Sequence, residues 1–281
     1  MDLRGNNYVV TGANAGIGYA VTQQLLAGGA TVIMACRNLT KAHAAIAELQ
    51  VYAHAIHVVQ LDLADFTSVH QGADKILNLL GPKPLHGLVN NAGVYTRSPP
   101  KGEQVEYHMQ VNHMGHFALT QLLYGKLCAS CAKVVHVSSA ASKIGVLNWR
   151  NSDDLYKLTT FRRYATSKLA NLLFHQELQR RIIDRGDEVT STVCHPGAVH
   201  TKLSGEVLPG LTRLLSGVMG LILLSTEQGA APVVTGLRTA TEADRFYGPN
   251  GSPLLSRRVQ NVEAAQALWR NSVSATGFDQ I

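Results

Sequence analysis

The sequence predicts an α/β protein with a doubly wound (Rossmann) parallel sheet and helices on both faces. Two observations carry this prediction. Short runs rich in β-branched residues alternate with longer segments of helical period, which places strands near 8–11, 31–36, 57–62, 87–90, 133–138 and 189–194. Runs such as 31–36 and 133–138 are largely apolar rather than alternating, which is typical of strands that helices cover on both sides.

The connecting segments have the periodicity of helices that pack on a sheet. After Asp65, which is placed to cap a helix, the apolar residues recur on one helical face. These residues are Phe66, Val69, Ala73, Ile76, Leu77 and Leu80. The chain of 281 residues is 46% hydrophobic and 16% charged, and no linker or charge block divides it. We therefore expect one domain over residues 1–281.

The composition limits the partners and the location of the protein. The net charge is +6, but the longest basic runs are pairs such as Arg162-Arg163, so nucleic acid is not an expected partner. The first expected strand follows the N-terminus almost at once, which favours a cytoplasmic protein without a secretory leader. The apolar stretch 214–224 is shorter than the roughly 18 residues that a membrane span needs, and it predicts at most a peripheral membrane contact.

The cysteines and histidines do not form a recognisable metal motif. Four cysteines are too few for a disulfide framework, and Cys128 and Cys131 form a single CxxC without a second pair. His113 and His116 share a helical face, but no nearby spacing supplies further ligands. We expect no metal site.

The first expected strand leads into a glycine-rich turn. Glycines at positions 12, 16 and 18 permit a tight turn, let the backbone approach a pyrophosphate and bring the next helix close to the strand. An ordinary glycine-rich turn is the alternative, but the position between a strand and a helix favours dinucleotide binding.

The end of the second expected strand indicates which dinucleotide binds. An NAD site would place Asp or Glu there, whereas this chain has Arg37 and Asn38. A guanidinium at this point could pair with a 2′-phosphate, which favours NADP(H). A surface arginine in a loop is the alternative.

Seven motifs in order along nearly the whole chain resemble those of the short-chain dehydrogenase/reductase family. They are Thr11-Gly-x-x-x-Gly-x-Gly18, Asp62-Leu63, Asn90-Asn-Ala-Gly93, Asn112, Ser139, Tyr164-x-x-x-Lys168 and Pro196-Gly-x-Val-x-Thr201. Each motif is weak alone, but seven in register make a chance match improbable.

The spacing of Tyr164 and Lys168 gives the resemblance a chemical meaning. Four residues apart on a helical pattern, both side chains project from one face. A free tyrosine has a pKa of about 10, and a neighbouring ammonium would stabilise its phenolate. Tyr164 is therefore the expected general acid/base, and Lys168 tunes it.

Two further residues complete the expected catalytic set. Ser139 would donate a hydrogen bond to the substrate oxygen. Ser138 competes for this role, but the resembled family uses the second serine of such a pair, and only one of the two can face the cleft. Asn112 would hold a water that links Lys168 to solvent, and its alternative is a buried structural amide.

The resemblance also implies the remaining cofactor contacts. Asp62 and Leu63 would flank the adenine, Asn90 the adenosine ribose, and Lys168 the nicotinamide ribose. The full set of expected cofactor-binding residues is Gly12, Asn14, Gly16, Ile17, Gly18, Arg37, Asn38, Asp62, Leu63, Asn90, Ala92, Gly93, Tyr164, Lys168, Pro196, Gly197, Val199 and Thr201.

One departure from the compact members of the family concerns the spacing before Tyr164. From Ser139 to Tyr164 there are 25 positions, about twice the spacing in those members, which suggests an inserted loop around 147–161. This arrangement is similar to the retinol dehydrogenase and WW-domain oxidoreductase branch. We expect no membrane anchor before the first strand and no WW module, so the resemblance to this branch does not by itself imply retinoid activity.

The segment 202–224 follows the expected nicotinamide loop and is apolar, with Pro209 and several glycines that break it. We expect it to be a jointed lid over a lipophilic substrate. A core helix, a homodimer contact and a membrane contact are the alternatives.

Together, these features predict an NADP(H)-dependent oxidoreductase that interconverts a carbonyl and an alcohol on a small lipophilic substrate. A double-bond (enone) reductase is the alternative within enzymes. A cofactor-binding regulator without turnover is the alternative outside them.

Overall fold

The computed structural model describes residues 2–97, 105–147, 151–197, 224–238 and 245–281, and these build one parallel sheet. The strand order is β3-β2-β1-β4-β5-β6-β7. The strands are β1 (Asn7–Thr11), β2 (Thr31–Cys36), β3 (Ile56–Gln60), β4 (Gly87–Asn90), β5 (Lys133–Val137), β6 (Thr190–Cys194) and β7 (Phe246–Tyr247). The predicted doubly wound fold is confirmed.

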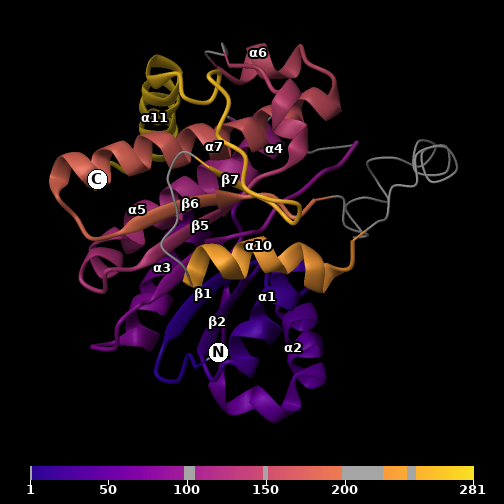
Figure 1. The fold of residues 1–281 in the computed structure, drawn as a ribbon, viewed down its shortest axis with the longest axis vertical. Coiled ribbons are helices and arrows are strands. Elements are labelled where there is room, and N and C mark those ends of the chain that lie inside the picture. The colour runs from indigo at the N-terminus through magenta and orange to yellow at the C-terminus, as the bar shows by residue number, and fades with distance from the viewer. Residues whose placement is uncertain (1, 98–104, 148–150, 198–223, 239–244) are drawn as a thin grey trace, which may run out of the picture.

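Helices cover both faces of the sheet (Figure 1). One face carries α1 (Gly16–Ala27), α2 (Leu39–Glu48) and α10 (Thr226–Arg238). The other carries α3 (Phe66–Leu80), α5 (Gly115–Cys128) and α7 (Thr160–Arg185), with α11 (Val262–Thr276) packed on α7. Shorter elements are η1 (Gln50–Ala55), α4 (Tyr107–Met109), η2 (Gln110–Met114), η3 (Ala140–Ile144) and α6 (Ser152–Tyr156).

The apolar strands predicted from the sequence separate two hydrophobic cores. Along β1, Tyr8 and Val10 pack toward α1 and α10, whereas Val9 between them packs toward α3 and α5. All three are buried. Because successive side chains of a strand point to opposite faces, a strand with helices on both sides buries side chains on both faces and is mostly apolar.

The sequence-based boundaries need three corrections. β3 ends at Gln60, not at 62, so Asp62 lies beyond the strand. The short strand β7 was not predicted, because two residues carry no periodicity. The segment 147–161, expected as a loop, contains helix α6, whose cap is the Asn151 side chain accepting a hydrogen bond from the N–H of Asp154. The predicted helix after Asp65 is confirmed, and the Asp65 side chain accepts from the N–H of Thr67.

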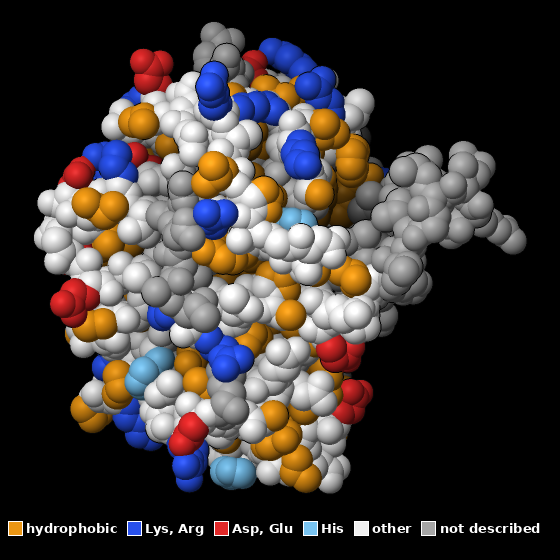
Figure 2. Space-filling view, viewed as in Figure 1, with side chains coloured by type: hydrophobic (Ala, Val, Ile, Leu, Met, Phe, Trp, Pro, Cys, Tyr) orange, Lys and Arg blue, Asp and Glu red, His pale blue; other side chains and the backbone are white. Residues whose placement is uncertain are grey.

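Neither the distribution of basic side chains nor the apolar character of the helices sets one region of the surface in Figure 2 apart. Lys and Arg side chains lie scattered among neutral and apolar ones over the face in Figure 2. Within the part of the chain that the structure describes, no helix is both long and apolar enough to cross a membrane.

The strand order reverses between β1 and β4. Doubly wound folds bind their ligands at such a reversal, beyond the carboxyl ends of the strands.

Candidate active site

The glycine-rich turn joins the carboxyl end of β1 to the N-terminus of α1. Gly12 has φ of 64°, a conformation that favours glycine. A Cβ at Gly18 would come within 2.5 Å of the Asn91 amide nitrogen, so only a glycine lets α1 approach this closely. Asn14 and Ile17 lie in the same turn and the first turn of α1. The arrangement leaves backbone N–H groups at a helix N-terminus, which is a site for a pyrophosphate.

Thr11 and Asn91, which the sequence reasoning did not assign to the site, lock this turn to the loop after β4. The Thr11 hydroxyl accepts from the N–H groups of Asn91 (2.9 Å) and Ala92 (3.0 Å), and the Asn91 side chain donates to the Thr11 carbonyl at 2.8 Å. These contacts join segments about 80 positions apart in the chain. Thr11 stands within the glycine motif, which is the one signal that could have drawn attention to it.

His116 orients the Thr11 hydroxyl from helix α5. Burial lowers the pKa of His116 to about 3, so the ring is neutral. Its Nδ1 lies 3.1 Å from the carbonyl of Asn112 and must carry the proton, which leaves Nε2 as an acceptor 2.9 Å from the Thr11 hydroxyl. The Thr11 hydroxyl accepts from two backbone N–H groups, and its one proton has two acceptors, His116 Nε2 at 2.9 Å and the Val89 carbonyl at 3.2 Å.

Arg37 and Asn38 follow β2 at the same edge of the sheet. Arg37 is exposed, and its guanidinium donates to the Tyr107 hydroxyl at 3.2 Å. The Asn38 side chain caps α2 by accepting from the N–H of Lys41. The guanidinium is thus held by a neutral partner, and its charge is not cancelled by that contact.

Three expected nucleotide contacts are less accessible than the sequence suggested. Asp62 is half-buried, and its carboxylate accepts from the N–H of Ala64 at 3.0 Å. Leu63 is buried against α5, so closely that a Cβ added at Gly115 would lie 2.7 Å from the Leu63 Cβ. Asn90 is buried, and its amide lies 3.0 Å from the Thr120 hydroxyl and 3.3 Å from the His136 ring. Any contact of Leu63 or Asn90 with a nucleotide would therefore come from the backbone.

Tyr164 and Lys168 lie on the buried face of α7. The Lys168 ammonium is 6.0 Å from the centre of the Tyr164 ring and donates to the Val137 carbonyl at 3.2 Å. Burial lowers the pKa of Lys168 to about 8. Burial also raises the pKa of Tyr164, against a smaller lowering by its hydrogen bond with Ser139. At neutral pH the phenol is protonated and can act as a proton donor.

The two serines after β5 face different ways. Ser139 is half-buried, its side chain lies near enough to the Tyr164 phenol to lower the pKa of that phenol, and its hydroxyl accepts from the N–H of Ala141. Ser138 is buried and donates to the Lys168 carbonyl at 2.7 Å. Of the two, only Ser139 has its hydroxyl beside the Tyr164 phenol.

Asn112 lies in the π-helical turn η2, a form of helix that often marks functional positions. Its side chain accepts from the N–H of Val94 (2.7 Å) and donates to the Val94 carbonyl (3.1 Å) and the Ser167 hydroxyl (2.9 Å). A Cβ on Gly93 would stand 3.1 Å from the Lys168 ammonium. The amide therefore ties the loop after β4 to α7, and the water-holding role expected for it stays a prediction.

The nicotinamide loop is described only in part. Pro196 and Gly197 follow β6 and are half-buried, and Gly197, with φ of 78°, donates its N–H to the His195 ring at 3.2 Å. Val199, Thr201 and residues 202–223 of the expected lid lie outside the described residues.

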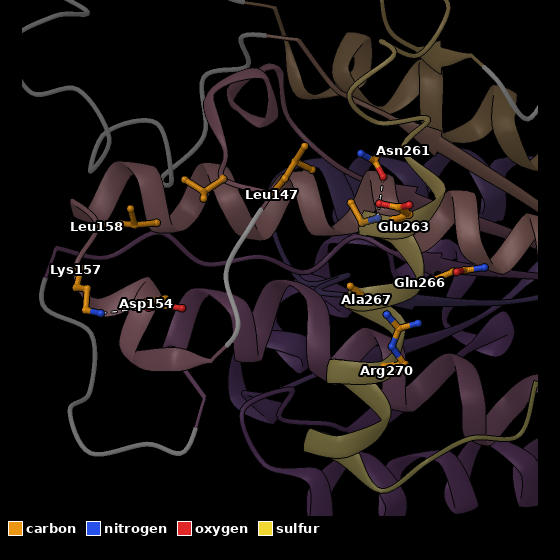
Figure 3. Close-up of a pocket in the computed structure, with 11 residues that line it drawn as sticks. Leu147, Asp154, Lys157, Leu158, Asn261, Glu263, Gln266, Ala267 and Arg270 are labelled. Atoms are coloured by element: carbon orange, nitrogen blue, oxygen red, sulfur yellow. Dashed lines mark hydrogen bonds and ion pairs between the residues drawn. The ribbon is translucent and has the colours of Figure 1, made fainter.

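A groove elsewhere on the surface is not part of this site. It runs between α6 and α11, has a volume of about 930 Å³ and is lined by residues such as Leu147, Asp154, Leu158, Glu263 and Arg270 (Figure 3). None of the four expected catalytic residues lines it. The expected catalytic residues therefore lie outside this groove.

A doubly wound sheet with a glycine turn after β1 and a Tyr-x-x-x-Lys face on α7 defines a dinucleotide-binding protein. The family model described as short chain dehydrogenase matches residues 6–211. The chain belongs to the short chain dehydrogenase family, as its motifs predicted, and it is an oxidoreductase of the retinol dehydrogenase-like type.

Relatives and solved structures agree with this assignment. Human retinol dehydrogenase 11 is 40% identical over 288 residues, and bovine (Bos taurus) retinol dehydrogenase 12 is 35% identical over 289; each alignment covers 99% of this chain and 88% of the relative. An uncharacterized protein from Mycobacterium Paratuberculosis aligns with a TM-score of 0.77 at 31% identity, covering 100% of this chain and 96% of the other. An NADPH-bound carbonyl reductase from chicken fatty liver aligns with a TM-score of 0.69 at 21% identity, over 90% of this chain and 100% of the other, and supports the fold alone.

Proposed function

We propose that this protein is an NADP(H)-dependent oxidoreductase that interconverts a carbonyl and an alcohol on a small lipophilic substrate. The observation that carries the proposal is the buried phenol of Tyr164, which has the Ser139 side chain near it and the Lys168 ammonium 6.0 Å from its ring centre. A proton donor, a second hydroxyl and a cation thus meet at one point beside the expected nucleotide site.

The turn after β1 fits a dinucleotide. Because Gly18 has no side chain, α1 packs closely on Gly12 and Asn91, which keeps the N–H groups at the N-terminus of α1 beside the turn. The exposed Arg37 guanidinium supplies a positive charge for a 2′-phosphate. When bound, NADP(H) supplies or accepts the hydride. The preference for NADP(H) over NAD(H) is supported by Arg37 and by the lack of an acidic residue at positions 36–38.

The chain's own residues handle the proton. In the direction of reduction, the Tyr164 phenol donates its proton to the substrate oxygen as negative charge develops there. Ser139 donates a hydrogen bond to the same oxygen. The Lys168 ammonium stabilises the phenolate that remains, because an opposite charge nearby favours the ionised form. In the direction of oxidation the same groups act in reverse, with the phenolate as the base.

The substrate class rests on the relatives and on the side chains around Tyr164. The relatives named above are retinol dehydrogenases, which by their name act on a lipophilic alcohol. Tyr95 and Phe161 lie with their ring centres 5.5 and 6.5 Å from that of Tyr164, so the surroundings of the phenol are aromatic. An apolar carbonyl compound suits such surroundings better than a charged one. We further propose a cytoplasmic location.

The proposal is tested by following the oxidation of NADPH, and separately of NADH, with a panel of aldehydes, ketones and enones. We expect turnover of aldehydes or ketones, with apolar compounds preferred. Reduction of enones alone would establish the double-bond reductase instead. Tight NADPH binding without turnover of any compound in either direction would establish a cofactor-binding regulator.

A further inference from the structure

The loop after β4, residues 91–97, contacts three of the four expected catalytic residues, namely Lys168, Asn112 and Tyr164. Gly93 passes beside the Lys168 ammonium, and both backbone polar groups of Val94 are bound by the Asn112 side chain. The Tyr95 ring meets the Tyr164 ring edge-on, with centres 5.5 Å apart and an interplanar angle of 86°. The position of this loop therefore determines what surrounds the Tyr164 phenol.

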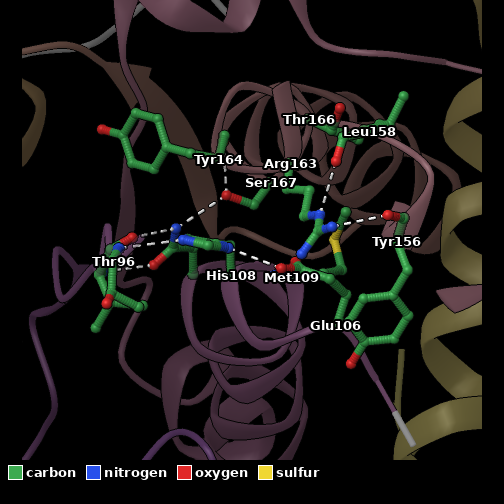
Figure 4. Close-up of polar contacts among 12 residues, drawn as sticks. Thr96, Glu106, His108, Met109, Tyr156, Leu158, Arg163, Tyr164, Thr166 and Ser167 are labelled. Atoms are coloured by element: carbon green, nitrogen blue, oxygen red, sulfur yellow. Dashed lines mark hydrogen bonds and ion pairs between the residues drawn. The ribbon is translucent and has the colours of Figure 1, made fainter. Parts of the chain in front are cut away.

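A buried acid–imidazole pair holds the far end of this loop (Figure 4). The side chains of Glu106 and His108 are both 0% exposed, and the carboxylate lies 2.7 Å from the ring Nδ1. The second carboxylate oxygen accepts from the N–H of Met109 at 3.1 Å. The N–H of Thr96 donates to His108 Nε2 at 3.2 Å. The pair thus bridges the start of α4 to the backbone of the loop.

The partners assign the proton of the imidazole. Because Nε2 accepts the N–H of Thr96, it carries no proton, so the ring proton lies on Nδ1 and is donated to the carboxylate. Glu106 then accepts two N–H groups, and the neutral ring of His108 is fixed in rotation. A ring turned by 180° would face the Thr96 N–H with carbon.

Packing alone does not account for this pair. Burying a carboxylate costs several kcal/mol, and apolar side chains of the same size would usually pack as well. The polar pair instead fixes the orientation of the imidazole. A carboxylate that accepts a hydrogen bond from one ring N–H sets the tautomer and holds the other ring nitrogen in place, as carboxylates do for histidines at metal sites. His108 also packs against Tyr95, with ring centres 5.9 Å apart.

We propose that Glu106 and His108 are positioning residues for the reacting site. They hold loop 91–97 through the N–H of Thr96, and through the loop they hold Tyr95 against Tyr164 and Val94 against Asn112. Neither residue touches the reacting atoms. The effect on turnover rests on the function proposed above, whereas the effect on the loop does not.

Two substitutions of His108 test the roles of its two ring nitrogens one at a time. In His108→Asn, the amide takes the place of Nδ1 and can still donate to Glu106, but the shorter side chain no longer accepts from the Thr96 N–H. In His108→Gln, the side-chain oxygen takes the place of Nε2 and can accept from Thr96. The matched control is His175→Asn, at a histidine that is also buried and whose Nδ1 meets the Ser191 hydroxyl at 2.8 Å, away from Tyr164.

We expect His108→Asn to lower kcat about tenfold or more, because small misplacements at a reacting site are costly. The KM for NADPH should change less than about twofold, and amide hydrogen exchange in the peptide containing Thr96 should accelerate. His108→Gln should restore most of kcat and the slow exchange. His175→Asn should lower Tm without lowering kcat.

Equal kcat and equal exchange for the asparagine and glutamine variants would overturn the proposal. If His108→Asn does not fold, His108→Gln decides by itself: kcat and exchange close to those of the unmodified protein support the proposal, and the loss of both contradicts it. If no substrate is turned over at all, the proposed function fails, and hydrogen exchange at Thr96 still tests the positioning role.

Discussion

The nucleotide end and the reacting end of the site are built in different ways. At the nucleotide end, the contacts available to a ligand are backbone groups of the turn after β1 and the exposed side chain of Arg37. At the reacting end they are buried side chains, with Tyr164 7% and Lys168 4% exposed. Exposed groups keep their ordinary chemistry, whereas burial changes it, as the lowered pKa of Lys168 shows. Substitutions at the reacting end should therefore change the chemistry, and those at the nucleotide end the choice of ligand.

The largest effect is expected from removing the phenol oxygen. Tyr164→Phe keeps the ring that packs against Tyr95 and should lower kcat roughly a hundred- to ten-thousandfold, the contribution of a positioned general acid. The dissociation constant for NADPH, measured by fluorescence, should stay nearly unchanged. A variant with near-normal kcat would show that the buried phenol does not carry the reaction.

The paired serines after β5 allow a sharper test. Ser139→Ala should lower kcat about a hundredfold, since its hydroxyl is aimed at developing charge. Ser138→Ala removes a buried hydrogen bond to the Lys168 carbonyl and should instead lower the free energy of unfolding by about 1 kcal/mol. Steady-state kinetics and urea unfolding of both variants check this. If Ser138→Ala is the more damaging to kcat, the assignment of the two serines is reversed.

Lys168 gives the reacting end a pH dependence. Its pKa is lowered to about 8, so the ammonium is present below pH 8 and is lost as the pH rises through that value. The kcat for reduction should fall as the pH rises above about 8. Lys168→Met should lower kcat about a hundredfold, and the kcat that remains should show no such decrease above about pH 8.

Linkage makes an independent prediction for the same residue. The unfolded chain binds the Lys168 proton more tightly than the folded one, so the free energy of unfolding should rise between about pH 8 and pH 10.5 relative to the methionine variant. A profile that is identical in both proteins would mean that another group titrates there.

The smallest effect is expected at the nucleotide end. Arg37→Asp should shift the ratio of kcat/KM for NADPH over NADH by about ten- to a hundredfold toward NADH, because a charge-assisted hydrogen bond to the 2′-phosphate is lost. Stability should hardly change, since the side chain is exposed. Arg270→Asp, at another exposed arginine on α11, is the control. An unchanged ratio would remove Arg37 from this role.

Much of the architecture was predictable from local patterns. Apolar strands such as β1 and β2, the glycine turn and the Asp65 cap could be placed because each depends on residues close together in the chain. The four-residue spacing of Tyr164 and Lys168 likewise puts both on one face of α7 whatever packs against it. The family followed from the order of these motifs.

Other features could not be predicted because they depend on contacts between distant segments. The burial of Leu63 and Asn90 is decided by α5 and β5, which pack over them. The same is true of the Thr11–His116 contact, between residues 105 positions apart.

The sequence by itself therefore determined the sheet, the glycine turn and the spacing of the reacting pair, because backbone periodicity and motif spacing are local. Only the tertiary structure decided which polar side chains face the site and which are enclosed behind it. It alone brought Tyr95 beside Tyr164 and the His108 imidazole beside Tyr95, because hydrogen-bond partners and pKa values depend on what surrounds a group in space.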